Sequence, residues 1–207
     1  VTPIVSIAAG AVVAYVVGPY IAIFTEWLGN LININVYKHP FIGGIVISVS
    51  MGMFLTLPIS SAAIGIMLGL SGLASGAATI GCCCQMVGFA VMSFKENKVG
   101  GLISQGIGTS MLQMPNIIRH PQIWIPPILS SAILAPVSTM VFKMVSNPVG
   151  SGMGTSGLVG QFSAYAVMVG AGTHPATAVI QIMVMHFVLP ALVTYVIAYG
   201  MRKAGWI

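Results

Sequence analysis

The chain contains only two acidic residues, Glu26 and Glu96, among 207. With seven lysines and arginines, charged residues make up 4% of the sequence, against about 25% in a soluble domain. The mean hydropathy is +1.02. Such a chain has too few charges to cover a water-facing surface, so the sequence predicts a protein embedded in a lipid bilayer.

The same scarcity of carboxylates limits the chemistry. Two-metal catalysis, glycoside hydrolysis and proton-relay chains all need clustered acids, which this sequence lacks. Cys82, Cys83 and Cys84 are consecutive, and successive residues of a helix point about 100° apart, so they cannot converge on one metal ion. We therefore expect no metal and no cofactor. Polar chemistry is left to amides, hydroxyls, backbone groups and histidine.

The seven basic residues are spread over short polar segments and form no run or stripe. The net charge of +5 therefore indicates the positive-inside bias of a membrane protein, and no nucleic-acid partner is expected. If Lys95 and Lys98 are cytoplasmic and residues 100–116 do not cross the bilayer, six of the seven fall inside and only Lys143 falls outside. The other four predicted inside are Lys38, Arg119, Arg202 and Lys203.

Apolar stretches of bilayer length recur along the chain. The predicted spans cover residues 3–27, 40–57, 74–94, 123–142 and 175–199, with shorter apolar helices at 62–70 and 162–170. Pro19 is expected to kink the first span near Val16–Gly18, and the polar residues 30–39 are expected to form a loop. Together these patterns predict an all-α polytopic membrane protein with about five or six transmembrane helices.

Two further segments are apolar but interrupted by glycines, residues 100–116 and residues 147–160. We interpret both as broken helices or re-entrant hairpins, which survive at membrane depth only where protein or a polar cavity surrounds them. The strongly polar residues 95–98 before the first segment are expected to form a loop. Paired broken helices are the usual indication of a transporter's midplane binding site.

Polar side chains expected at membrane depth fall into four clusters. The clusters are Ser60 and Ser61; Gln85; Thr109, Ser110, Gln113 and Asn116; and Thr155, Ser156 and Gln161. Buried amides and hydroxyls are costly without partners, so they either bond between helices or converge on a cavity. If they converge, they form a neutral, hydroxyl-rich site for a small polar solute.

Histidine precedes proline at three helix starts, His39, His120 and His174. Proline favours the first turn of a helix, so helix initiation is the ordinary explanation. His174 follows the glycine-rich residues 170–172 and is kept as a binding candidate, and His186 lies mid-span, as a packing residue or a functional one. The predicted substrate-binding residues are Gln113, Asn116, Ser60, Ser61, Gln85 and His174.

Three stretches resemble a known family. They are HPFIGGIVISVSMGMFLTLPISSAA (39–63), GGLISQGIGTSMLQMPNIIRHPQIWIPPILSSAI (100–133) and GMGTSGLVGQ (152–161). The chain resembles the IIC membrane component of the sugar phosphotransferase system, glucose superfamily, and within it the divergent IIC-like branch that includes the perfringolysin O regulator. The first residues of the chain also resemble the span that opens the substrate-binding half of those proteins.

The resemblance implies a single membrane domain over residues 1–207, corresponding to the C-terminal, substrate-binding half of a longer IIC-like protein. The chain starts without methionine, which we take as a further sign of a fragment or a processed protein. The full-length protein is expected to be a homodimer in the bacterial inner (cytoplasmic) membrane. It is expected to bind a small polar solute, a sugar in the family, and to work with separate phosphotransferase carrier proteins.

One departure from the family bears on chemistry. Sugar-phosphorylating members carry a signature glutamate in the hairpin, and Gln113 stands at the corresponding position. An amide can hydrogen-bond a sugar hydroxyl but cannot take its proton. The family's histidine pair is likewise replaced, by Ser60 and Ser61. Three readings stay open: a transporter working by alternating access, a membrane sensor or regulator without phosphotransfer, and a phosphorylating permease that uses a separate carrier. Whether the chain is an enzyme is left undecided.

Overall fold

The computed structural model describes residues 2–207 and builds them almost entirely from helices. Over that range the only β-pairing is a single bridge between Gly72 and Ser146. The α-helices are α1 (Thr2–Lys38), α2 (Pro40–Thr56), α3 (Ser61–Met67), α4 (Gly72–Met92), α5 (Phe94–Ile103), α6 (Met114–Arg119), α7 (Ile125–Pro136), α8 (Pro148–Ser151), α9 (Val159–Gly170), α10 (Pro175–Met183) and α11 (Leu189–Lys203). Shorter 3₁₀ and π turns are η1 (Ser104–Gly108), η2 (Ser110–Gln113), η3 (Pro121–Trp124), η4 (Val137–Phe142), η5 (Ser156–Leu158) and η6 (Val184–Val188).

Among the residues that the structure describes, three continuous helical stretches are long and apolar enough to cross a bilayer. They are α4, the stretch Pro121–Phe142 that contains α7, and the stretch Pro175–Lys203 that contains α10 and α11. The predicted spans at 74–94, 123–142 and 175–199 match them, and α2 is a shorter apolar helix where the span 40–57 was expected. The protein is an all-α polytopic membrane protein.

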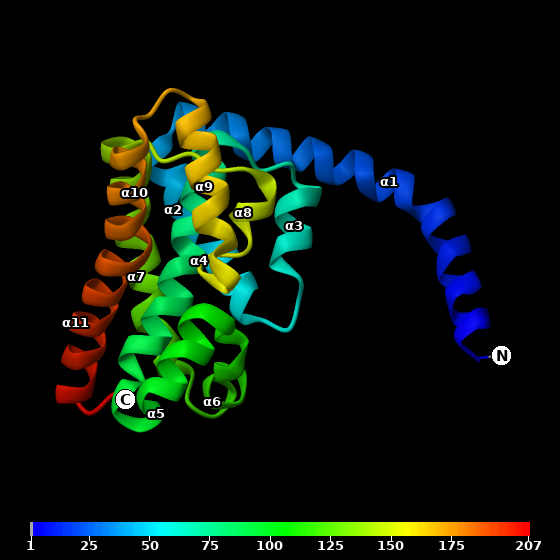
Figure 1. The fold of residues 1–207 in the computed structure, drawn as a ribbon. Coiled ribbons are helices and arrows are strands. Elements are labelled where there is room, and N and C mark those ends of the chain that lie inside the picture. The colour runs from blue at the N-terminus through cyan, green and yellow to red at the C-terminus, as the bar shows by residue number, and fades with distance from the viewer. Residues whose placement is uncertain (1) are drawn as a thin grey trace.

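Helix α4 lies at the centre of the bundle, and α2, α7 and α11 pack around it (Figure 1). Its small residues permit close approach, as is common between membrane helices. A Cβ added at Gly81 would collide with the Ser48 carbonyl of α2, and one at Gly88 would collide with Thr194 of α11. The two helices also approach closely at Gly52, where an added Cβ would collide with the Gly81 carbonyl.

Helices α2 and α4 run in the same direction, because the short helix α3 returns the chain to its starting end. Ser48 lies beside Gly81, and farther along both helices Thr56 is bonded to Gln85. α2 therefore ends at the level of Gln85, seven residues before α4 ends at Met92. Ser61 then donates to the Gly152 carbonyl at 2.6 Å and docks α3 beside α8.

The parallel arrangement corrects the expected distribution of charge. We call the end of the molecule that contains α5, α6 and the C-terminus the lower end, as in Figure 1, and the opposite end the upper end. The Pro40 carbonyl accepts a bond from Thr139 of η4, near the end of the stretch Pro121–Phe142, so Lys38 lies at the upper end with Lys143. Five of the seven basic residues lie at the lower end, and the expectation of six was wrong for Lys38. The five are Lys95, Lys98, Arg119, Arg202 and Lys203.

The two glycine-interrupted segments form broken helical hairpins that approach from opposite ends. The first hairpin comprises α5, η1, η2 and α6 and lies at the lower end; the second comprises α8, η5 and α9 and descends from the upper end (Figure 1). They meet where the Thr155 hydroxyl donates to the Gly106 carbonyl and Ser156 donates to the Gly108 carbonyl at 2.9 Å. The loop expected at residues 95–98 is instead part of α5, broken at Lys98, where φ is +52°.

Helix α1 extends well beyond the bundle and bends along its length, with Pro19 inside it (Figure 1). The loop expected at residues 30–39 is wrong, because the helix continues to Lys38. The polar side chains of this stretch serve another purpose. Asn33 donates to the Gly69 carbonyl at 3.0 Å and accepts from the Ser71 amide at 3.2 Å, which ties α1 to the link between α3 and α4.

Candidate functional site

A cavity of about 500 Å³ opens at the lower end of the bundle. The end of α4, the residues around α6 and the end of α11 enclose it. Its walls combine apolar residues with polar and charged side chains. They comprise Phe89, Met92, Ser93, Glu96, Asn97, Gln113, Asn116, His120, Ile123, Arg202 and Ile207. Two of the six predicted binding residues, Gln113 and Asn116, lie here.

The amides of the first hairpin form a connected chain of hydrogen bonds. Asn116 donates to Gln113 at 2.9 Å, and Gln113 donates to Gln105 at 2.9 Å. Gln105 in turn donates to Ser93 of the α4–α5 junction at 3.2 Å. Gln113 is 6% exposed, so this chain fixes its amide at the cavity wall. Each of these groups can both donate and accept, which is what recognition of a hydroxyl requires.

An ion pair borders the same cavity. Arg202 contacts Glu96 at 2.9 Å and also donates to the Met92 carbonyl at 2.8 Å. The side chains of Arg202 and Glu96 are 30% and 54% exposed, so solvent screens the pair and its contribution to stability is below about 1 kcal/mol. Its importance is positional, because it joins α5 to the end of α11 at the cavity.

A second polar cluster lies deeper, beside α4. Gln85 accepts from Thr56 at 3.2 Å and from the Trp124 indole at 3.0 Å. Thr56 also bonds to Ser110 of the first hairpin at 3.0 Å. The amide nitrogen of Gln85 is buried with no partner, which costs about 1–3 kcal/mol in a protein interior. Such a donor is available to an acceptor that enters the bundle.

Ser60, Ser61 and His174 lie elsewhere and do not line the cavity. Ser60 accepts from the Ala63 amide and caps α3, and Ser61 bonds to the second hairpin. His174 accepts from the Ala176 amide at 3.3 Å, at the exposed start of α10 at the upper end. All three begin or anchor helices, and for His174 this is the helix-start interpretation of the histidine–proline pairs.

Buried polar residues of α9 and η6 bond to each other across helices. Gln161 is paired with His186 at 3.1 Å, and its amide nitrogen also contacts the Cys83 sulfur at 3.5 Å. Both Gln161 and His186 are buried. This pair is an interhelical hydrogen bond, the alternative that the sequence left open for these clusters.

Sequence reasoning missed Gln105, Glu96 and Arg202. Gln105 lies in an apolar, glycine-rich run that gives no helical period, and Glu96 was assigned to a polar loop. Arg202 comes five residues before the end of the printed sequence, where a charge is ordinary. Their partners are separated by up to about a hundred residues, so only the folded structure reveals them.

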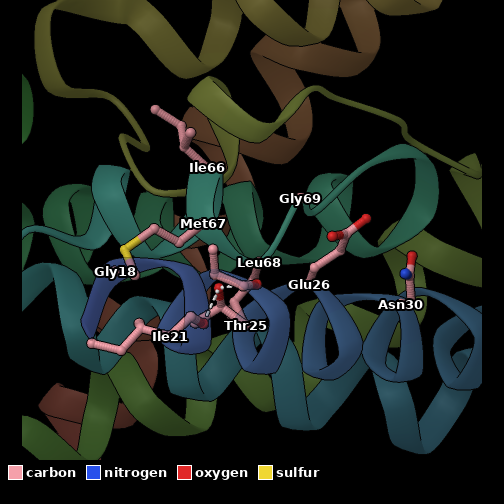
Figure 2. A pocket seen from close by; sticks show the side chains of 10 residues that line it. Gly18, Ile21, Thr25, Glu26, Asn30, Ile66, Met67, Leu68 and Gly69 are labelled. Atoms are coloured by element: carbon pink, nitrogen blue, oxygen red, sulfur yellow. Dashed lines mark hydrogen bonds between the residues drawn. The ribbon is translucent and has the colours of Figure 1, made fainter. Parts of the chain in front are cut away.

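A larger groove, of about 730 Å³, lies between α1 and the end of α3. Figure 2 shows Glu26 and Asn30 of α1 projecting on the side where Gly69 lies, with Met67 and Leu68 nearby. Thr25 is already bonded to the carbonyls of its own helix. The groove holds no amide chain comparable to that of the lower cavity, so the lower cavity is the better candidate for solute recognition.

Comparison with protein families gives one match that covers the whole chain. The model described as "Phosphotransferase system, EIIC" matches residues 1–207. The chain belongs to this EIIC family. Neither a search of curated proteins nor a search of solved structures gives a match.

In this EIIC chain the cavity that holds Gln113 also holds one carboxylate, that of Glu96. The amide at position 113 cannot act as a base, and the Glu96 carboxylate is held by Arg202. The wall is otherwise neutral and rich in hydrogen-bonding groups. Its chemistry therefore favours binding through hydrogen bonds over proton transfer.

Proposed function

We propose that this EIIC-family chain binds a small polar solute, a sugar, in the lower cavity and carries it across the membrane by alternating access. The amide chain from Ser93 through Gln113 to Asn116 is the observation that carries the proposal. It presents donors and acceptors in fixed positions, as a polyhydroxylated solute requires.

The size and the mixed walls of the cavity support this proposal. Its volume of about 500 Å³ lies within the range of about 300–1,000 Å³ that is usual for small-molecule sites. Phe89 and Ile123 supply apolar surface for the C–H faces of a sugar ring, and Asn97 and His120 add polar groups around the rim. The described wall contains a paired charge but no unpaired acidic group, which fits a neutral solute.

The path through the bundle passes between the two hairpins. Their tips are held together by the hydroxyls of Thr155 and Ser156, bonded to the carbonyls of Gly106 and Gly108. A solute leaving the cavity towards the upper end requires these contacts to separate, with the unpaired amide of Gln85 as a donor along the way. In transporters, alternating access is usually the rocking or gating of one part of the molecule against another around a fixed site.

Charge sets the proposed orientation. Five of the seven basic residues lie at the lower end, and by the positive-inside rule this supports a cavity that faces the cytoplasm, with the protein in a bacterial inner membrane. We further propose that residues 1–207 act as the substrate-binding half of a longer, homodimeric protein. Separate phosphotransferase carrier proteins would then reach the solute from the cytoplasm.

The replacement of the signature glutamate supports a second candidate, a sensor that binds the solute without phosphorylating it. Gln113 cannot take a proton from a sugar hydroxyl, and Glu96 is paired with Arg202. Adding carrier proteins and a phosphate donor to proteoliposomes separates the candidates. Phosphorylated sugar would establish a phosphorylating permease, counterflow without phosphorylation would establish a transporter, and binding without either would establish the sensor.

A thermal-shift panel of sugars, sugar acids and nucleosides, applied to the protein in neutral detergent, tests the proposal. A ligand that binds only the folded state adds about 2.7 kcal/mol at a hundredfold excess over its dissociation constant. We expect stabilisation by at least one sugar and none by nucleosides. The absence of any stabilising sugar would contradict the proposed function.

A further inference from the structure

A second hollow lies at the lower end, on the outer side of Arg202. It has a volume of about 260 Å³ and lies between the ends of α4 and α11 and the start of α5. Val91, Leu102 and Ala198 contribute apolar walls, and Lys95 and Arg202 contribute positive charge. We call it the Lys95 groove. It is distinct from the solute cavity, although Met92 and Arg202 line both.

The Lys95 groove lies where two helical stretches that are long and apolar enough to cross a bilayer end. α4 ends at Met92, and the stretch that contains α11 ends at Lys203. These ends mark the level at which the hydrocarbon core gives way to lipid headgroups. Tyr195 and Tyr199 line the groove and stack on each other, with ring centroids 6.3 Å apart and planes inclined by 24°. Tyrosines with one apolar face and one wet end are characteristic of this interface.

The groove is positively charged, and no carboxylate is among its described lining residues. Lys95 is exposed, and the Arg202 guanidinium has one carboxylate partner, Glu96, which lies on the side of the solute cavity. Cations between membrane helices at the interface attract anionic headgroups, at about 1 kcal/mol for each lysine or arginine. Arginine also matches the geometry of phosphate oxygens.

We propose that the Lys95 groove binds one anionic phospholipid, with its phosphate at Lys95 and Arg202 and an acyl chain along Val91 and Ala198. The occupant is a lipid because the charged groups of the groove lie on the headgroup side and its apolar walls lie on the hydrocarbon side, in the order of the layers of a bilayer. Its phosphate competes with Glu96 for the Arg202 guanidinium, so the lipid alters the charge bordering the solute cavity. The groove is thus a lateral site from which the bilayer acts on the solute site.

The test uses the delipidated chain in neutral detergent, titrated with phosphatidylglycerol while its thermal stability is followed. The variant is Lys95→Gln, and the matched control is Lys98→Gln, which removes the same charge from an exposed residue outside the groove. We expect Lys95→Gln to raise the half-maximal lipid concentration about fivefold, the equivalent of one lysine–headgroup contact, and Lys98→Gln to change it by less than about twofold.

Two further arms identify the source of the phosphate. Phosphatidylcholine is expected to stabilise the protein less than phosphatidylglycerol at every concentration, and inorganic phosphate is expected to have no effect. If Lys95→Gln and Lys98→Gln change the half-maximal lipid concentration equally, the lipid is attracted diffusely to the positively charged lower end, and the proposed site is overturned. Equal effects of the two lipids, or stabilisation by inorganic phosphate alone, would overturn the assignment of an anionic lipid.

Discussion

The two broken hairpins look alike in the sequence but bond in different ways. Both are rich in glycine, interrupted by polar residues and too irregular for a simple span. In the first hairpin, Gln105, Gln113 and Asn116 bond side chain to side chain beside a cavity. In the second, the backbone is the partner: Thr79 and Cys82 of α4 bond to its carbonyls.

This difference separates a hairpin that can recognise a solute from a hairpin that supports the bundle. The second hairpin is docked on α4 through its main chain, and its own polar side chains cap a helix and join it to the first hairpin. The first hairpin leaves amides at a cavity wall, where a solute can bond to them. Substitutions in the second hairpin are therefore expected to change stability, and substitutions in the first to change affinity.

The largest expected effect comes from Gly154→Ala in the second hairpin. Gly154 has φ +52°, and an added Cβ would approach the Cys82 backbone to within 2.8 Å. Left-handed strain costs about 1–2 kcal/mol and overpacking about 1–3 kcal/mol, so we expect a loss of about 3 kcal/mol in the free energy of unfolding. Thermal unfolding measures it. The control is Gly157→Ala, which has the same φ of +52° but no atom nearer than 3.9 Å, and should lose only about 1 kcal/mol. Equal losses would show that close packing on α4 is unimportant.

The next effect is on affinity and comes from Gln113→Ala. Removing this amide leaves Gln105 and Asn116 without their partner and takes one bond from the solute. We expect sugar binding to weaken by about 1–3 kcal/mol in a calorimetric titration. Gln161→Ala, which removes a similarly buried glutamine from the second hairpin, should leave the affinity unchanged. A larger loss in Gln161→Ala than in Gln113→Ala would reverse the comparison.

A smaller effect is expected at the contact between the hairpins. Thr155→Val removes the hydroxyl that donates to the Gly106 carbonyl while keeping the shape of the side chain. We expect the free energy of unfolding to fall by about 1 kcal/mol. Because the tips separate more easily, the rate of sugar counterflow in proteoliposomes should rise. A slower rate at unchanged affinity would contradict the proposed separation of the tips.

The smallest effect is expected from Glu96→Gln. The pair with Arg202 is partly exposed, so its loss should change stability by less than about 1 kcal/mol. Sugar affinity should change by less than about fivefold. Glu96 lies only at the border of the cavity, and Arg202 stays in position through its bond to the Met92 carbonyl. Complete loss of sugar phosphorylation in an otherwise active preparation would instead show that Glu96 supplies the base that Gln113 cannot.

The sequence predicted where the helices lie along the chain better than it predicted how they pack against one another. Long apolar stretches around α4, α7 and α11 identify spans because bilayer thickness fixes their length. The parallel course of α2 and α4 depends on where Ser61 docks, a contact with Gly152 that no local pattern encodes. Asn33 looked like a loop residue because its distant partner, the Gly69 carbonyl, was unknown.

The candidate site was predicted only in part, because some of its residues are recognised only through contacts with distant partners. Gln113 and Asn116 were identified because polar residues in a broken apolar segment are informative by themselves. Glu96 and Arg202 were missed because each is unremarkable in its own segment and becomes informative only when the two meet at 2.9 Å. His174 was included from its glycine-rich neighbourhood, and the structure places it at an exposed helix start.

The most direct test of the account is protection of the lower cavity by its solute. The three native cysteines are fully buried, so an introduced thiol can be labelled with little background. Asn116→Cys places a thiol at the cavity, and Ser60→Cys places one at an exposed residue outside it. With the sugar that stabilises the protein most in the panel, labelling after Asn116→Cys should slow several-fold while labelling after Ser60→Cys stays constant. Unchanged labelling after Asn116→Cys at saturating sugar would contradict the assignment of the cavity as the solute site.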